Sequence, residues 1–181
     1  MATVLRVVVL ASVTWSAVQI LLVGRRIRKG AIGQPPISRP AFTLAKICLT
    51  VPFALLLWTA AVRPPQLALL TTVLVLCLLV VGTIIFALGL FKLGANLRMG
   101  LPQEETVLIT SGIYRFSRNP IYLGAFMMMA ASLVYAFSWV NLVATAVAVI
   151  LHHRITLAEE KYLASRFKDF ASYRTRVRRY C

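Results

Sequence analysis

The chain has 181 residues, of which 60% are hydrophobic and only 14% are charged, whereas an average soluble domain carries about 25% charged residues. Its 20 Lys and Arg residues outnumber its 5 Asp and Glu residues, which gives a net charge of +15. A nucleic-acid-binding protein can share this charge balance but not a mean hydropathy of +0.82, while basic membrane proteins show both together. The composition therefore predicts an integral membrane protein and no nucleic-acid partner.

Three apolar runs precede residue 92, and each reaches the length of about 20 residues that a membrane-spanning helix needs. They cover approximately residues 4–24, 41–62 and 67–91. The first run exceeds the roughly 7–15 residues of a signal-peptide core, and a transmembrane helix tolerates the proline at position 52 of the second run. We therefore expect three transmembrane helices within an N-terminal region that covers residues 1–91.

The apolar stretch 121–151, with a polar break at 138–141, is longer than one span and shorter than two. Basic residues gather in segments 25–39 and 92–120 and in the tail from Arg154, and cations concentrate on the cytoplasmic side of a membrane. These segments share one side only if the stretch enters the membrane and returns. The sequence thus predicts an all-α polytopic protein with five transmembrane helices, N-terminus outside and C-terminus inside, whose last two helices form a hairpin.

The tail after Leu157 carries apolar residues at steps of three or four, the spacing of one helical face. They are Leu163, Phe167, Phe170, Tyr173, Val177 and Tyr180. Cations such as Arg166, Arg174 and Arg178 fall on the other faces. This pattern predicts a C-terminal amphipathic interfacial helix that lies apolar side down on the bilayer, with its cations toward anionic lipid.

A first polar cluster, Ser111–Gly124, leads into the fourth predicted span. Asn119 is a good N-cap, and Pro120 suits the first turn of a helix. The free N–H groups of such a helix start favour a carboxylate or a phosphate, and Gly124 permits the close approach of another helix or of a flat ligand. The alternative is a capped helix with an interfacial Tyr-Arg belt and a packing glycine.

A second cluster, His152-His153-Arg154 followed by Glu159-Glu160, lies at the predicted membrane exit. Arg154 and Glu159 are separated by about 140° around a helix, so they can reach different parts of one ligand rather than pair with each other. Adjacent histidines diverge by about 100° and no third ligand type is clustered here, so we expect no metal site. The alternative is a charge cluster that marks the membrane boundary.

The order of these motifs resembles the isoprenylcysteine carboxyl methyltransferase family, whose relatives include membrane phospholipid and thiol methyltransferases. The motifs are Gly112-Ile113-Tyr114, then Arg118-Asn119-Pro120-Ile121-Tyr122-Leu123-Gly124, and, after the hairpin, Arg154, Glu159-Glu160 and Leu163. The resemblance covers about residues 88–180 and indicates a catalytic, cofactor-binding region over 92–181. A histidine of the family is replaced by Asn119, which can still donate a hydrogen bond but does not titrate near neutrality.

The resemblance implies an S-adenosylmethionine-dependent methyltransferase with a cofactor pocket that faces the cytoplasm. Arg118, with the helix start at Asn119 and Pro120, would then take the cofactor's carboxylate. Glu159 or Glu160 would accept hydrogen bonds from its ammonium or its ribose hydroxyls. Tyr114 or Tyr122 would stack on its adenosine, and Gly124 would leave room beside it. These residues form the expected cofactor-binding set.

The methyl acceptor implied by the resemblance is lipophilic and enters from the bilayer. It is the carboxylate of an isoprenylcysteine-like compound, or another lipid or thiol. Arg154 would orient an anionic acceptor, whereas His153 or a glutamate such as Glu159 would deprotonate a thiol or an amine. The compact length is typical of small prokaryotic members and predicts an inner-membrane location. Two other functions stay open: a basic membrane protein that binds anionic lipid without catalysis, and a sterol-reductase-like oxidoreductase that uses NADPH.

Overall fold

The structure is a computed structural model that describes residues 2–26, 33–94, 100–101 and 107–180. The predicted cytoplasmic cations Arg28, Lys29 and Arg98 lie outside the described residues. Within the described ranges the fold is helical, and the one β-type pairing is an isolated bridge between Gln34 and Leu101. The predicted all-α class is therefore confirmed.

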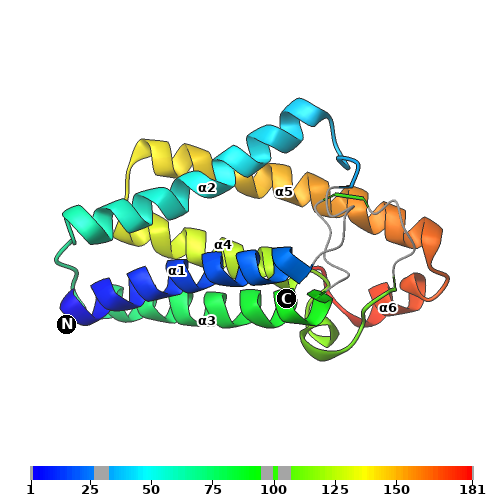
Figure 1. Cartoon of the computed structure of the whole chain (residues 1–181), viewed down its shortest axis with the longest axis horizontal. Coiled ribbons are helices and arrows are strands. Elements are labelled where there is room, and N and C mark those ends of the chain that lie inside the picture. Colours follow the sequence, from blue (N-terminus) through cyan, green and yellow to red (C-terminus); the bar gives the residue numbers. More distant parts are fainter. Residues whose placement is uncertain (1, 27–32, 95–99, 102–106, 181) are drawn as a thin grey trace.

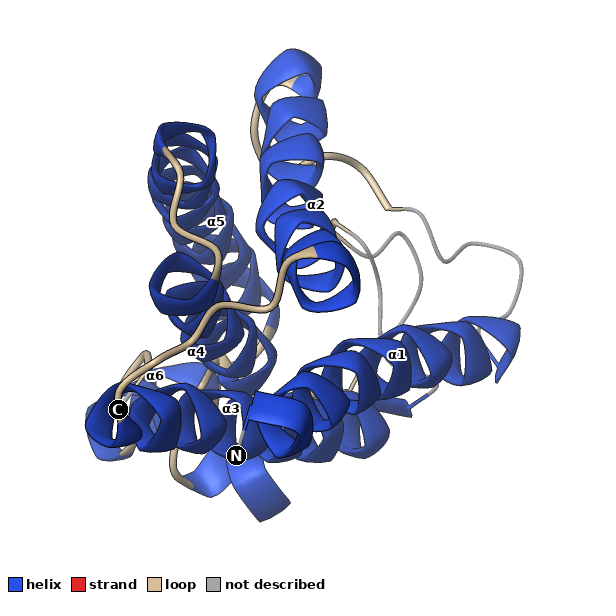
Figure 2. Cartoon of the chain, turned by 90° about the vertical axis from the view of Figure 1, so that its left-hand side faces the viewer, coloured by secondary structure: helices blue, strands red, loops and turns tan. Residues whose placement is uncertain are grey.

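Five long helices run along the length of the molecule, and two short ones lie near one end (Figure 1). The long helices are α1 (Ala2–Arg26), α2 (Arg39–Val62), α3 (Leu69–Leu93), α4 (Pro120–Tyr135) and α5 (Trp139–Arg166). The short ones are the 3-10 helix η2 (Gly112–Arg115) and α6 (Phe170–Arg176). Helix α3 packs against both α1 and α4, while α2 packs along α5 (Figure 2).

Four of the described helices, namely α1, α2, α3 and α5, are long and apolar enough to cross a membrane. Helix α4 has 16 residues, so it rises about 24 Å and is shorter than the roughly 30 Å hydrocarbon core. The predicted helices are thus present at the predicted places. The predicted count of five spans is not confirmed, because only four of the described helices are candidate spans, and the orientation of the chain stays a prediction.

The break between α4 and α5 is a turn that polar side chains stabilise. The hydroxyl of Ser138 accepts a hydrogen bond from the backbone N–H of Asn141, 3.1 Å away, as an N-cap does. The fully buried amide of Asn141 donates to the carbonyls of Ser132 and Ala136 at 3.1 and 2.9 Å. These carbonyls lie at the end of α4, where a helix lacks its own partners, so Asn141 closes the predicted hairpin.

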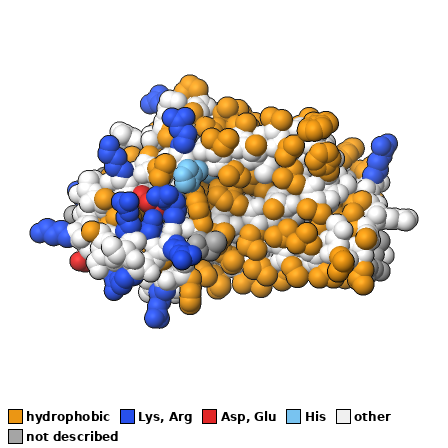
Figure 3. All heavy atoms as spheres, turned by 180° about the vertical axis from the view of Figure 1, so that it is seen from behind, with side chains coloured by type: hydrophobic (Ala, Val, Ile, Leu, Met, Phe, Trp, Pro, Cys, Tyr) orange, Lys and Arg blue, Asp and Glu red, His pale blue; other side chains and the backbone are white. Residues whose placement is uncertain are grey.

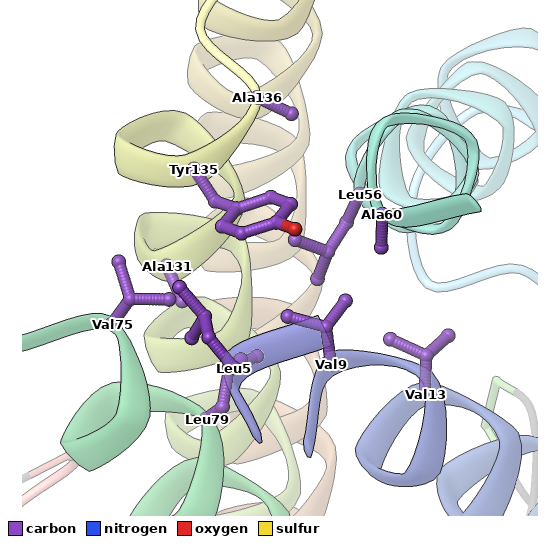
Figure 4. Packing of buried hydrophobic residues seen from close by; sticks show 10 residues of the cluster. All are labelled: Leu5, Val9, Val13, Leu56, Ala60, Val75, Leu79, Ala131, Tyr135 and Ala136. Atoms are coloured by element: carbon purple, nitrogen blue, oxygen red, sulfur yellow. The ribbon is translucent and has the colours of Figure 1, made fainter. Parts of the chain in front are cut away.

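A hydrophobic cluster joins the four helices α1 to α4 at the end of the molecule opposite α6 (Figure 4). Its buried members are Leu5, Val9, Val13, Leu56, Ala60, Val75, Leu79, Ala131, Tyr135 and Ala136. Closer to the other end, α3 and α4 approach each other through glycine. A Cβ atom added to Gly124 would lie 2.5 Å from the carbonyl oxygen of Gly82 and 2.7 Å from the nitrogen of Phe86. The absence of side chains at Gly82 and Gly124 therefore permits the close contact between α3 and α4.

Charge is distributed unevenly along the molecule (Figure 3). On the face shown, Lys and Arg side chains gather at the end that carries α6, and hydrophobic side chains cover most of the remaining length. Large apolar side chains such as Leu70, which is 84% exposed, point outward from the helices. Such a surface suits lipid rather than water, and the basic end agrees with the side that the positive-inside rule assigns to the cytoplasm.

The prediction of a continuous interfacial helix in the tail is wrong. Helix α5 ends at Arg166, and α6 is only seven residues long. Phe170, Tyr173 and Val177 have the predicted helical spacing, but they are buried in a cluster inside the protein rather than presented to lipid. Their apolar partners are Leu108, Leu163 and Phe167.

We predict that Gly124→Ala destabilises the fold, because the added methyl group meets the backbone of α3, which cannot move as a flexible side chain does. Overpacking of this kind costs about 1–3 kcal/mol of the free energy of unfolding. Thermal unfolding of the purified protein in detergent measures the effect. Val81→Ala, on an outward-facing position of α3, is the control and should leave the unfolding temperature nearly unchanged. Equal stability of both variants would contradict the tight α3–α4 contact.

Candidate active site

The start of α4 and the paired glutamates of α5 lie side by side. Nη2 and Nε of Arg118 donate to Oε1 of Glu160 at 2.9 and 3.2 Å. The two side chains are only 7% and 8% exposed, so this is a buried ion pair between segments 42 residues apart. The structure therefore brings together the two polar clusters that the sequence analysis assigned to one cavity.

Arg118 also holds the C-terminal tail by donating hydrogen bonds to backbone carbonyls of the tail. The remaining guanidinium nitrogen, Nη1, donates to the carbonyls of Arg174, at 3.2 Å, and of Val177. The backbone N–H of Arg118 donates to the carbonyl of Arg178 at 3.0 Å. Each guanidinium nitrogen of Arg118 thus has a partner within the protein, and three of these contacts fix the course of residues 174–178.

Glu160 binds a second guanidinium, which comes from the tail. Nε and Nη2 of Arg179 donate to the two carboxylate oxygens of Glu160 at 3.1 and 2.9 Å, and these hydrogen bonds raise the pKa of Arg179. Asn119 occupies the predicted N-cap position, but its side chain does not cap α4. Its amide donates instead to the carbonyl of Arg179 at 3.2 Å. We call the set of Arg118, Asn119, Glu160 and Arg179 the tail clamp.

A cavity of about 180 Å³ opens beside the tail clamp. Its described lining residues are Leu93, Gly100, Leu101, Val107, Leu108, Ile109, Tyr114, Arg118, Asn119, Glu159, Glu160, Tyr162, Leu163, Phe170 and Tyr173. Typical small-molecule pockets measure roughly 300–1,000 Å³, so the cavity enclosed by the described residues is smaller than such a pocket. Residues 102–106, which follow one lining residue and precede another, are outside the described part of the chain.

Two tyrosines place aromatic rings on the cavity wall. The hydroxyl of Tyr173 donates to the carbonyl of Tyr114 at 2.6 Å, and the hydroxyl of Tyr114 donates to the carbonyl of Gly89 in α3 at 3.4 Å. Burial raises the pKa of Tyr173 to about 12 and also raises the pKa of Tyr114. Both hydroxyls therefore keep their protons at neutral pH and act as donors, which links η2, α3 and α6 around the cavity.

Glu159 differs from its neighbour because no guanidinium binds it in the described part of the chain. The hydroxyl of Tyr122 in α4 lies 3.5 Å from Oε1 of Glu159. The ring of Tyr122 lies against the ring of His152, with 5.4 Å between centroids. Glu159 lines the cavity, so it presents a carboxylate that is available to a cationic or hydroxyl-bearing ligand.

Two of the predicted cofactor-binding residues contact α3 instead. A Cβ atom on Gly89 would lie 3.2 Å from Cγ of Pro120, and Gly124 faces the backbone of Gly82. Both residues are buried and neither lines the cavity. The close approach of another helix, one of the two roles predicted for Gly124, is therefore present, and its contact with a cofactor stays a prediction.

Two of the predicted catalytic residues lie away from the cavity. Arg154 is exposed and is not part of the cavity lining. Nδ1 of His153 lies 3.1 Å from the hydroxyl of Tyr180 near the end of the tail. Their roles toward a methyl acceptor stay predictions, and the cavity itself contains Glu159 as the remaining member of that set.

Sequence reasoning missed several residues near the site. Phe170 and Tyr173 were assigned to a lipid-facing surface, although they line the cavity. Lys46 interacts electrostatically with Glu159 from α2. The signal for Lys46 was present, because it is the one charged residue in the apolar run 41–62, and charges inside spanning helices mark functional sites.

Comparisons with known proteins agree with the motif order. The family model described as phospholipid methyltransferase matches residues 65–169, which is more than half of the chain. The match includes α3, η2, α4 and α5, and thus both polar clusters of the site. No curated protein and no solved structure matches the chain. The resemblance to membrane methyltransferases is thereby confirmed, and the chain belongs to the phospholipid methyltransferase family.

Proposed function

We propose that this membrane protein transfers a methyl group from S-adenosylmethionine to a lipophilic acceptor that reaches the site from the bilayer. Membership of the phospholipid methyltransferase family supports methyl transfer at a membrane. The observation that carries the cofactor assignment is the cavity lined both by Glu159, whose carboxylate no described guanidinium binds, and by the rings of Tyr114, Phe170 and Tyr173. These groups complement the ammonium or ribose hydroxyls and the adenine of the cofactor.

The two adjacent glutamates take different roles in this proposal. Glu159 would hold the ammonium or the ribose of the cofactor. Glu160 is already bound by Arg118 and Arg179, so we assign it and Arg118 to positioning the tail, in place of the direct carboxylate contact expected for Arg118. The cofactor carboxylate would then meet the surplus positive charge of the tail clamp, which holds two guanidinium groups and one carboxylate.

When bound, the cofactor supplies an electrophilic methyl group on a sulfonium. The residues of the chain would align it and keep water away, which are the main contributions an enzyme makes to such a displacement. Phe170 and Tyr173 serve the second task, because both are at most 4% exposed and are part of the cavity wall.

We further propose that the site faces the cytoplasm from an inner membrane, with the N-terminus outside and the C-terminus inside. The support is the concentration of cations at the end that carries the site (Figure 3). Arg166, Arg174, Arg176 and Arg178 are exposed there and suit contact with anionic lipid headgroups. A non-catalytic anionic-lipid-binding protein would use the same cations, so cofactor binding discriminates between the two functions.

The purified protein should bind S-adenosylmethionine and should not bind NADPH, and it should transfer labelled methyl groups to a fraction of a total lipid extract. We predict that Glu159→Gln weakens cofactor binding about 10- to 100-fold, the range expected when a charge-assisted hydrogen bond is lost. Isothermal titration calorimetry in detergent measures the dissociation constant.

Lys161→Gln is the matched control, because it changes an exposed charge on the same helix, and it should bind like the wild type. A wild-type protein that binds no S-adenosylmethionine would overturn the proposed function. Unchanged affinity in both Glu159→Gln and Arg118→Ala, with binding by the wild type intact, would overturn the assignment of the site alone.

We predict that Glu160→Gln releases the tail, because the two guanidinium groups lose the charge that holds them and one remains buried. Limited digestion with trypsin should then cleave within residues 174–179 at least tenfold faster than in the wild type, and cofactor affinity should fall as the cavity loses its wall. Asp169→Asn, an exposed acid at the start of α6 that forms no cap, is the control. Equal cleavage rates in the two variants would show that the tail clamp does not hold the tail.

A further inference from the structure

Lys46 places a cation inside α2, a helix that is long and apolar enough to cross a membrane. It lies seven residues beyond the start of α2 at Arg39, which corresponds to about 10 Å along the helix. The side chain is half-buried, and its Nζ lies 4.9 Å above the ring of Phe42. A cation at such a position is costly unless an anion or a ring faces it, so residues of this kind mark binding sites.

His152 of α5 is fully buried and leaves one ring nitrogen without a partner. Its Nδ1 lies 2.8 Å from the carbonyl oxygen of Ala148, and a carbonyl only accepts, so Nδ1 carries the hydrogen. In the neutral ring Nε2 is then a free acceptor, and no described residue donates to it. A buried acceptor without a donor destabilises a protein unless a ligand or water supplies the hydrogen bond.

These two groups converge on the inner side of Glu159. Helix α2 packs along α5 (Figures 1 and 2), and Lys46 interacts electrostatically with both Glu159 and His152. His152 lies two helical turns, about 10 Å, from Glu159 toward the middle of α5, and the ring of Tyr122 packs on it. No salt bridge joins Lys46 to Glu159 among the described residues, so the cation is not neutralised by direct contact.

We propose that Lys46 and His152 form the acceptor side of the site. Lys46 binds an anionic group of the methyl acceptor, and Nε2 of His152 accepts the hydrogen of its nucleophilic atom. This inference rests on the proposed function. If Glu159 binds the ammonium or ribose of the cofactor, its negative charge no longer balances the positive charge of Lys46. An anionic group of the acceptor then takes the place of the Glu159 carboxylate as the counter-charge of Lys46.

In the resulting step the nucleophile, an amine or a thiol, forms a bond to the methyl carbon while the carbon–sulfur bond of the methylsulfonium donor breaks. The nucleophile's N–H or S–H bond breaks as well, and its proton moves to Nε2 of His152. The donor leaves as an uncharged thioether. Lys46 takes no part in bond changes and acts as a specificity residue. Lys46 lies outside residues 65–169, which match the family model, so the match to the family does not itself assign this role.

Initial rates of methyl transfer at saturating labelled S-adenosylmethionine test both roles, with the concentration of total lipid extract in mixed micelles varied. Lys46→Met should raise the lipid concentration for half-maximal rate at least tenfold, and Lys46→Arg should restore it to within about threefold. His152→Gln, which still accepts a hydrogen bond but takes no proton, should lower the maximal rate about 100-fold without changing the half-maximal lipid concentration.

Calorimetric cofactor binding, measured on each variant, shows whether the site is folded, and all four variants should match the wild type within twofold. Arg63→Met removes an exposed cation at the opposite end of α2 and should leave all parameters unchanged. An unchanged half-maximal lipid concentration in Lys46→Met, or an unchanged maximal rate in His152→Gln, overturns the corresponding role while the proposed function stands. Absence of cofactor binding or of lipid labelling by the wild type overturns the proposed function itself, and this inference with it.

Discussion

The buried contact of Glu160 with Arg118 and Arg179 is the interaction on which the site depends. A half-satisfied buried ion pair is strongly destabilising, and this contact avoids that cost because both carboxylate oxygens and every guanidinium nitrogen of Arg118 have partners. Since several of those partners are backbone carbonyls of the tail, the charges fix a main-chain path. The last part of the chain is thereby held as a wall of the cavity.

The tail clamp needs its own support, which comes from the contact between α3 and α4. Arg118 can meet Glu160 only if α4 begins at one particular height and distance from its neighbours. Gly124 and Gly82 let the two backbones approach more closely than side chains would allow, and Gly89 accommodates Pro120 at the start of α4. At the far end of the hairpin, Asn141 ties the end of α4 to the start of α5. Small residues and one buried amide thus set the register in which the charges meet.

Local sequence signals were sufficient for the helices but not for the tail. Apolar length, Pro120 and the break before Asn141 predicted α1 to α4 and the start of α5 within a few residues, because those features act within single segments. Helix α5 continues to Arg166, about nine residues beyond the predicted membrane exit at Leu157. The periodicity of Phe170, Tyr173 and Val177 did identify an apolar face. It could not indicate whether lipid or Leu108 covers that face, because both are apolar. Whether protein or lipid covers the face depends on contacts between segments far apart in the sequence, such as those of Arg118 with the tail.

Adjacent positions on one helix explain how paired glutamates acquire separate tasks. Side chains at consecutive positions diverge by about 100°, so Glu160 turns toward the two guanidinium groups while Glu159 turns toward Tyr122 in α4. The carboxylate of Glu160 holds the tail in place by binding both guanidinium groups. The carboxylate of Glu159 therefore lines the cavity without a guanidinium partner among the described residues. Lys46 interacts with Glu159 electrostatically but forms no salt bridge with it among the described residues, so the ammonium of Lys46 remains available to an anionic group of a ligand. The tail clamp therefore does more than shape the cavity. By binding Glu160 it keeps Arg118 and Arg179 away from Glu159, so the carboxylate of Glu159 remains available to a cationic group of a ligand, while the clamp itself retains one surplus positive charge.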